Sequence, residues 1–231
     1  LGFYNKLAFY SIIALAFSKT FVFSFYHPVL AEGLLIIFLA ATILFYLRCL
    51  NDPGIINVTF LIIFSILVCV SKISGAFILL VFGTSMALSN YLAKPKVNRY
   101  LENFILMLVP LIWFATSRLI VGNQENPGDP IFLGTKYLQL TWVTDVIVFL
   151  FIVPFGVVLP ILGLIKGDQY NLKTQACSCL CFTAACYAAL LILYGKHGDY
   201  HLAPVYFLAV FTVPVAMAEL SRIRQACKQS C

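Results

Sequence analysis

Charge is scarce in this sequence. Only 10% of its 231 residues are charged and 62% are hydrophobic, whereas soluble domains carry about 25% charged residues. This composition excludes a soluble globular protein. The sequence also lacks a His-Glu-x-x-His motif and an N-terminal basic stretch followed by a short apolar core and a small-residue cleavage site. We therefore predict no metal site, no cofactor and no signal peptide.

Internal repeats and low-complexity segments are missing as well, and apolar residues do not alternate with polar ones, which disfavours a β-barrel. Instead, apolar runs of about 20 residues recur, the length at which an α-helix crosses about 30 Å of hydrocarbon. We predict an all-α, polytopic transmembrane helix bundle that forms a single domain over residues 1–231. Its eight spanning helices are expected at 7–26, 29–47, 55–71, 76–92, 101–121, 144–165, 176–194 and 202–220.

Lysine and arginine are unevenly divided between the two sides that these spans define. Ten of the fifteen lie in the N-terminus, 48–54, 93–100, 166–175 or the C-terminus. The positive-inside rule makes that side cytoplasmic, so we expect both termini in the cytoplasm and the protein in a bacterial inner (plasma) membrane. The acidic residues divide four inside and five outside, which leaves the formal charge of +6 on the cytoplasmic side. This charge is a topology signal and does not predict nucleic-acid binding.

One external connection is much longer than the others. The loop 122–143 carries Asn-Pro-Gly-Asp-Pro at 126–130, and a long turn-rich loop among short ones is usually functional or disordered. Acids, bases, imidazoles and phenols gather on the same side, a mixture that can bind a phosphate and move a proton. The candidate acids are Glu32, Asp129 and Asp145. The candidates for phosphate or sugar binding are Lys72, Lys136, Lys196, His197, Tyr200 and His201.

Two candidates lie at the edges of apolar runs. Glu32 is a few residues into its predicted helix, where a carboxylate is costly unless it is paired or reaches the interface. It is either functional or an acid favoured by a helix N-terminus. Lys72, in Ser-Lys-Ile-Ser-Gly between two apolar runs, marks a tight external turn. It is either the polar hinge of a helical hairpin or a contact for a lipid phosphate, and we favour the second because external lysines are scarce.

The segment 195–204 concentrates ammonium, imidazole and phenol groups between two apolar runs. If the last helix begins early, His197 and His201 share a face with Tyr200 close by. All three kinds of group donate hydrogen bonds to phosphate or sugar oxygens. The alternatives are Tyr and His residues of an interfacial belt and, at Lys196, a lysine that reaches the membrane surface.

Four of the eight cysteines open the predicted helix 176–194: Cys177, Cys179, Cys181 and Cys186. The reducing cytoplasmic side disfavours disulfides there. We expect these small residues to allow close helix packing, with reversible palmitoylation of cysteines near the membrane surface as a second role.

Residues 26–32, Tyr-His-Pro-Val-Leu-Ala-Glu, open an apolar run, and a short basic link follows at Arg48. The next run ends in Val-Ser-Lys-Ile-Ser-Gly at 70–75. This succession resembles the C-type (GT-C superfamily) polytopic membrane glycosyltransferases, which use polyprenyl-phosphate-linked sugar donors at the external membrane face. The resemblance implies that Glu32 is the acidic residue that follows an external loop in that family. It also implies that Ser-Lys-Ile-Ser-Gly is the family's Thr-Lys-x-x-Gly-like turn.

The family's Arg-Tyr-x-x-Pro segment, which meets the lipid phosphate, corresponds to Tyr-His-Leu-Ala-Pro at 200–204. The arginine is missing here, so Lys196, His197 or His201 would supply the positive charge. The family's catalytic carboxylate lies in a large first external loop, whereas the first external link of this chain, around His27, is short. This departure leads us to expect the C-terminal portion of a longer enzyme, or a chain without the catalytic base.

Two hypotheses remain open. The first is an integral membrane glycosyltransferase, or a fragment of one, in which an external carboxylate deprotonates an acceptor hydroxyl and cations stabilise the departing phosphate. The start at Leu1 favours a fragment. The second is a non-catalytic polytopic membrane protein, a transporter or an assembly subunit, for which mid-helix charges and inverted repeats are typical. The expected partners are membrane lipid, a polyprenyl-phosphate sugar donor and, for a subunit, other membrane subunits.

Overall fold

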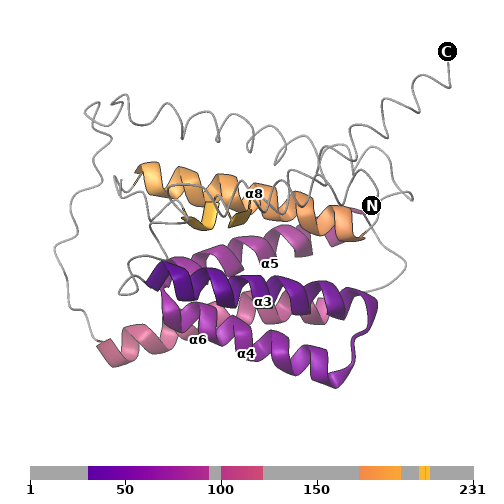
Figure 1. Ribbon diagram of the computed structural model, residues 1–231, viewed down its shortest axis with the longest axis horizontal. Helices are drawn as coiled ribbons and strands as arrows, with labels where there is room; N and C mark the ends of the chain where they lie inside the picture. Colours follow the sequence, from indigo (N-terminus) through magenta and orange to yellow (C-terminus); the bar gives the residue numbers. More distant parts are fainter. Residues whose placement is uncertain (1–30, 94–99, 122–171, 194–202, 206, 209–231) are drawn as a thin grey trace, which may run out of the picture.

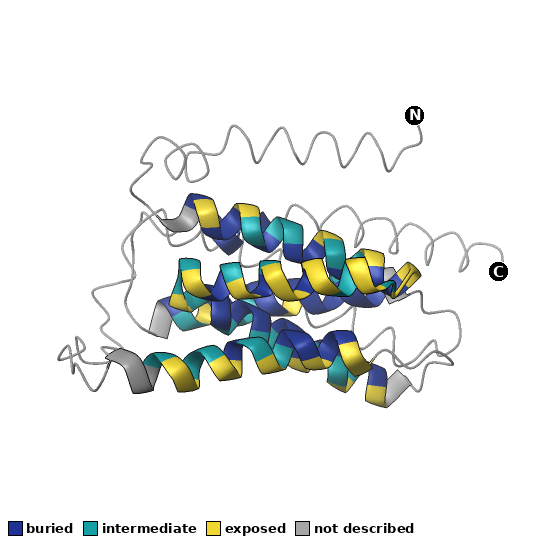
Figure 2. Ribbon diagram, turned by 90° about the horizontal axis from the view of Figure 1, so that it is seen from below, coloured by how far each residue is buried: buried dark blue, intermediate teal, exposed yellow. Residues whose placement is uncertain are grey.

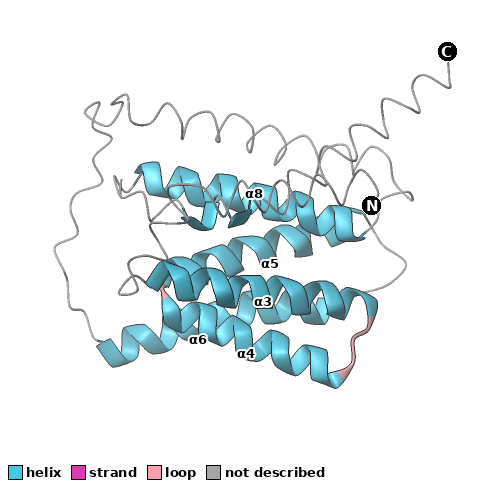
Figure 3. Cartoon of the chain, in the orientation of Figure 1, coloured by secondary structure: helices cyan, strands magenta, loops and turns pink. Residues whose placement is uncertain are grey.

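A computed structural model describes residues 31–93, 100–121, 172–193, 203–205 and 207–208. Within these residues the chain is helical apart from two short links (Figure 3). Its long helices are α3 (Ala31–Asn51), α4 (Ile55–Ser71), α5 (Ile73–Ala93), α6 (Tyr100–Val121) and α8 (Leu172–Leu193). The all-α prediction is confirmed for this part of the chain.

Three helices are long and apolar enough to cross a membrane, over Gly33–Asn51, Ile73–Tyr91 and Tyr100–Ser117. Shorter apolar stretches form α4 and most of α8. Apolar helices of this length match the thickness of the hydrocarbon layer, and they identify the chain as a membrane protein. The predicted spans 7–26 and 144–165 lie outside the described residues, so the expected number of eight crossings stays a prediction.

The predicted boundaries were accurate for two helices and too narrow for three. Spans 55–71 and 101–121 agree with α4 and α6 to within one residue. By contrast, α3 continues to Asn51 instead of residue 47, α5 begins at Ile73 instead of 76, and α8 begins at Leu172 instead of 176. Polar residues explain part of the difference between the predicted and the observed helix ends. Their side chains form hydrogen bonds to helices of the bundle, so the helices continue past them. Asn51 Nδ2 donates to Leu47 O at 3.2 Å, and Gln175 bonds to α5.

From α3 to α6, consecutive helices lie side by side and run antiparallel (Figure 1). The closest partners are α3 with α4 and α5 with α6, while α8 lies along α5. Consequently α3 and α5 run in one direction, and α4, α6 and α8 run in the other. We name the two ends of the bundle after one residue each. The Lys72 end comprises Ala31, Lys72, Val121 and Leu193, and the Asn103 end comprises Asp52, Ala93, Tyr100 and Leu172.

The last residue of α6 and the first residue of α8 lie at opposite ends of the bundle. Val121 is at the Lys72 end, whereas Gln175 near the start of α8 bonds to Ser89 and Asn90 near the end of α5. The predicted span 144–165 between these two helices lies outside the described residues and stays a prediction.

Two glycines of α5 allow its neighbours to approach closely. A Cβ atom on Gly75 would lie 2.5 Å from Val68 O and 2.7 Å from Leu35 Cδ1. One on Gly83 would lie 2.9 Å from Leu106 Cβ. Small residues at such contacts are typical of membrane helices, whose association depends on close packing. They bring α5 against α3, α4 and α6.

The described helices are buried on the sides that face one another and exposed on their outer sides (Figure 2). Many exposed side chains are large and apolar, including Ile55, Ile56, Ile66, Leu88, Leu111 and Ile112. Some buried hydroxyls are satisfied within their own helices: Ser65 donates to Leu61 O and Thr183 donates to Cys179 O, both at 2.7 Å. The buried Ser74 Oγ and Ser178 Oγ, by contrast, have no hydrogen-bond partner. The apolar exterior fits a lipid environment.

Candidate functional site

Lys72 is the single residue between α4 and α5. Its backbone is extended, with φ −164° and ψ 143°, and its carbonyl accepts a hydrogen bond from Gly75 N at 2.9 Å. The preceding Ser71 Oγ donates to Val68 O at 2.8 Å, which satisfies a carbonyl in the last turn of α4. The side chain of Lys72 is partly exposed. The predicted tight turn is confirmed, and its position on the external side stays a prediction.

Glu32 lies in the first turn of α3, at the same end of the bundle as Lys72. Three residues further along α3, the Leu35 side chain packs against Gly75, near the Lys72 turn. Three helical residues span about 4.5 Å along the axis. The backbone of Glu32 is therefore within about one helical turn of the contact between α3 and α5. The orientation of its carboxylate lies outside what the structure describes.

The other candidates lie outside the described residues, as does the loop 122–143. They are Asp129, Lys136, Asp145, Lys196, His197, Tyr200 and His201. Pro204, the last residue of the segment that resembles the family's phosphate-binding motif, is buried in the helical stretch 203–205. The structure thus brings together the backbone segments that carry Glu32 and Lys72, and the remaining site assignments stay predictions.

Sequence reasoning missed a group of buried polar side chains at the Asn103 end. Tyr46 Oη in α3 donates to Asn103 Oδ1 in α6 at 2.7 Å. Both side chains are buried, and the neighbouring Glu102 is only 2% exposed. Tyr46 also meets Phe82 of α5 edge to face, with 5.2 Å between the ring centroids. This tyrosine therefore links three helices.

Gln175 makes a second polar connection at the same end. Its Nε2 donates to Ser89 Oγ at 2.7 Å and to Asn90 Oδ1 at 2.8 Å, which joins α8 to α5. One turn further along α8, Cys179 lies against the hydroxyls of Ser85 and Ser89. Hydrogen bonds between membrane helices are worth about 0.6 to 2 kcal/mol each. An amide side chain inside an apolar run, such as that of Gln175, indicates a hydrogen bond between helices. This signal in the sequence could have predicted the polar contacts at the Asn103 end.

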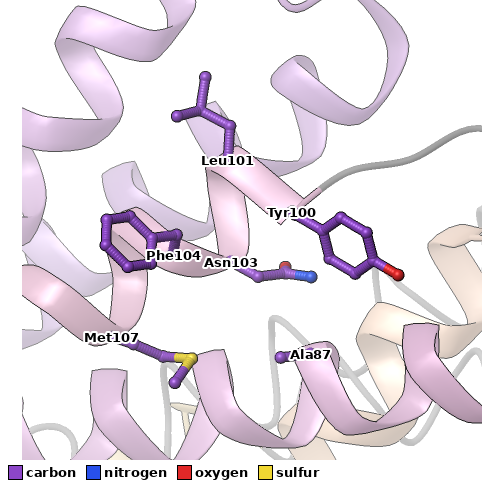
Figure 4. Close-up of a pocket in the computed structure, with 6 residues that line it drawn as sticks. All are labelled: Ala87, Tyr100, Leu101, Asn103, Phe104 and Met107. Atoms are coloured by element: carbon purple, nitrogen blue, oxygen red, sulfur yellow. The ribbon is translucent and has the colours of Figure 1, made fainter.

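A pocket of about 470 Å³ opens beside α5 and α6 near the Asn103 end (Figure 4). Its lining residues are Ala87, Tyr100, Leu101, Asn103, Phe104 and Met107. Asn103 Nδ2 is buried and has no hydrogen-bond partner, although Oδ1 of the same amide accepts the bond from Tyr46. The pocket is thus apolar except at its tyrosine and its asparagine.

In the part of the chain that the structure describes, no group of three or more His, Cys, Asp or Glu residues is placed to hold a metal ion. Six cysteines lie there and none of them forms a disulfide: Cys49, Cys69, Cys177, Cys179, Cys181 and Cys186. In α8, Cys179 and Cys181 are buried against neighbouring side chains, in keeping with a packing role.

Comparisons with protein-family models, with curated proteins and with solved structures found no match. The function of the chain must therefore be inferred from its own residues.

Proposed function

We propose that the chain is an integral membrane glycosyltransferase, or a C-terminal portion of one, that transfers a sugar from a polyprenyl-phosphate donor at the external membrane face. The observation that supports this function best is the position of Lys72, in a one-residue turn beside the start of the helix that carries Glu32. An ammonium group at a helix end can neutralise a lipid phosphate. A carboxylate nearby can accept the proton of an acceptor hydroxyl.

The proposed reaction assigns separate roles to cations and acids. A carboxylate takes the proton of the acceptor hydroxyl while the oxygen of that hydroxyl bonds to the anomeric carbon. The candidates for this carboxylate are Glu32, Asp129 and Asp145. The bond between that carbon and the phosphate oxygen breaks, and the lipid phosphate leaves with the electron pair. Cationic groups stabilise the charge that develops on this phosphate. The groups proposed to hold the donor are Lys72, Lys136, Lys196, His197, Tyr200 and His201.

This function requires the Lys72 end to face the exterior and both termini to face the cytoplasm. The distribution of basic residues supports that orientation, since ten of the fifteen lie in segments assigned to the cytoplasmic side. The Asn103 end, with the link at 52–54, would then face the cytoplasm. A bacterial inner membrane is the proposed location.

The test is binding of a polyprenyl-phosphate sugar to the purified protein and to Lys72→Ala. We expect binding to weaken about ten-fold or more, as for the loss of a charge-assisted hydrogen bond. Lys72→Arg should retain most of the affinity because it keeps the positive charge. Arg48→Ala is the matched control, since Arg48 is exposed near the opposite end and lies over the Phe45 ring. His201→Ala is tested separately, and unchanged binding in both alanine variants would refute the phosphate-binding role.

A second candidate is a transporter or an assembly subunit without catalytic activity. The buried, hydrogen-bonded polar residues that join α3 to α6 and α5 to α8 favour it, because polar groups inside a membrane bundle often belong to transport pathways or subunit contacts. Sugar transfer by the purified protein, lost in Glu32→Gln, would favour the enzyme. Absence of transfer from the full-length protein together with a stably bound membrane subunit would favour the second candidate.

A further inference from the structure

We propose that the pocket beside α5 and α6 binds the ester and acyl region of a membrane glycerolipid, with Asn103 Nδ2 donating a hydrogen bond to an ester carbonyl. This site is at the opposite end of the bundle from the proposed sugar-transfer site. It does not depend on that function, because none of its lining residues is a proposed catalytic or donor-binding residue.

The pocket has the size and chemistry of a site for an apolar chain. Its volume of about 470 Å³ falls within the range of about 300 to 1,000 Å³ that is typical of ligand sites. Leu101, Phe104 and Met107 supply most of its apolar wall, and Ala87 leaves space on the α5 side. The methionine side chain is flexible and polarisable, which suits a wall against chains of variable shape.

Asn103 supplies one polar group that lacks a partner. The side chain is 1% exposed, and Tyr46 Oη donates to its Oδ1 at 2.7 Å. That bond orients the amide and leaves Nδ2 without an acceptor. In Figure 4 the amide nitrogen points toward the space between Tyr100 and Ala87. Buried donors are rarely left unsatisfied in folded proteins, so a ligand oxygen at this point would complete the site.

The position of the pocket along α6 specifies what kind of oxygen it meets. Asn103 is three residues after Tyr100, the first residue of α6, which is about 4.5 Å along the axis. This depth corresponds to the boundary between headgroups and hydrocarbon, where tyrosine side chains are also enriched. Glycerolipids carry ester carbonyl oxygens at that boundary, each attached to an acyl chain. The pocket has no charged lining residue, so its chemistry selects the ester and acyl region and not the phosphate.

The test compares two lipids that differ only at the carbonyl. Purified full-length protein is incubated with a diacyl phosphatidylcholine or with its dialkyl ether analogue of equal chain length, and the retained lipid is measured by native mass spectrometry. We expect the wild-type protein to retain the ester lipid about five-fold better, the change expected for one ordinary hydrogen bond. The double variant Tyr46→Phe/Asn103→Leu removes both hydrogen-bonding partners together and should retain the two lipids equally.

A filling variant tests the pocket without disturbing the Asn103 bond. Ala87→Phe places a ring in the space and should reduce retention of both lipids about ten-fold. Leu88→Phe is its control, because Leu88 is 59% exposed on the same helix and does not line the pocket. Equal retention of the two lipids by the wild-type protein would overturn the role of the amide. Wild-type retention in Ala87→Phe would overturn the site, and competition by inorganic phosphate would assign it to a phosphate instead.

Discussion

The two ends of the bundle carry their polar residues in different ways. At the Lys72 end, a partly exposed lysine forms the whole connection between two helices, and the helices approach one another through Gly75. At the Asn103 end, uncharged amides, hydroxyls and a phenol are buried and bonded between helices. A polar group that remains accessible can meet a substrate, whereas one that is buried between helices fixes their relative positions. The described contacts therefore differ in kind between the two ends: a partly exposed turn at the Lys72 end and buried bonds between helices at the Asn103 end.

The strongest test of this contrast is Gly75→Ala. The added methyl group would meet Val68 O at 2.5 Å and Leu35 Cδ1 at 2.7 Å. Because the first of these atoms is backbone, we expect the free energy of unfolding to fall by about 3 kcal/mol. Denaturation in mixed detergent micelles measures the change.

Gly54→Ala is the matched control for that prediction. The nearest atom to a Cβ on Gly54 is a carboxylate oxygen of Asp52 at 3.5 Å, in an exposed link, so its effect should stay within about 0.5 kcal/mol. A Gly75→Ala protein as stable as wild type would show that α3, α4 and α5 do not approach as closely as described.

A smaller effect is expected from the bond between Tyr46 and Asn103. In a double-mutant cycle with Tyr46→Phe and Asn103→Leu, the coupling energy should be about 0.6 kcal/mol, the average for hydrogen bonds between membrane helices. The free energy of unfolding of the four proteins gives this value. A coupling energy of zero would mean that the Asn103 end gains no stability from the pair.

The smallest change in stability should come from Lys72→Ala. The side chain is partly exposed, and the turn is held by the backbone of Lys72 and by Ser71 Oγ. We expect the free energy of unfolding to change by less than about 0.5 kcal/mol, even though donor binding falls as proposed above. A loss of stability as large as that of Gly75→Ala would make Lys72 a structural residue and remove the contrast between the ends.

Much of the described fold could be predicted from the sequence, because length and apolarity are visible along the chain. The link before α4 contains Pro53 and Gly54, which interrupt the apolar run, and Lys72 interrupts the next. The buried faces could not be predicted in the same way. Helices that are apolar on all sides have no polar face to indicate their orientation. Tyr46 is fully buried whereas Tyr91 is 70% exposed, and only the packing of the neighbouring helices separates them.

The candidate site, like the fold, could be predicted from the sequence only in part. The break at Lys72 indicated a turn, but its closeness to the start of α3 depends on the contact between Leu35 and Gly75, two residues far apart in sequence. The pocket near Asn103 was even harder to predict from the sequence. It requires the side chains of two helices, and its one unsatisfied amide nitrogen is recognisable only when the bond to Tyr46 is known.

The one-residue connection at Lys72 also has a consequence for the surrounding bilayer. The 17 residues of α4 span about 26 Å, less than the hydrocarbon thickness of about 30 Å, whereas the 21 residues of α5 span about 32 Å. Two helices of unequal length that share one turn create a hydrophobic mismatch, which lipids accommodate by local thinning. Thinning of this kind lowers the headgroup layer toward Lys72. Bilayer thickness itself would then control how closely a lipid phosphate approaches its ammonium group.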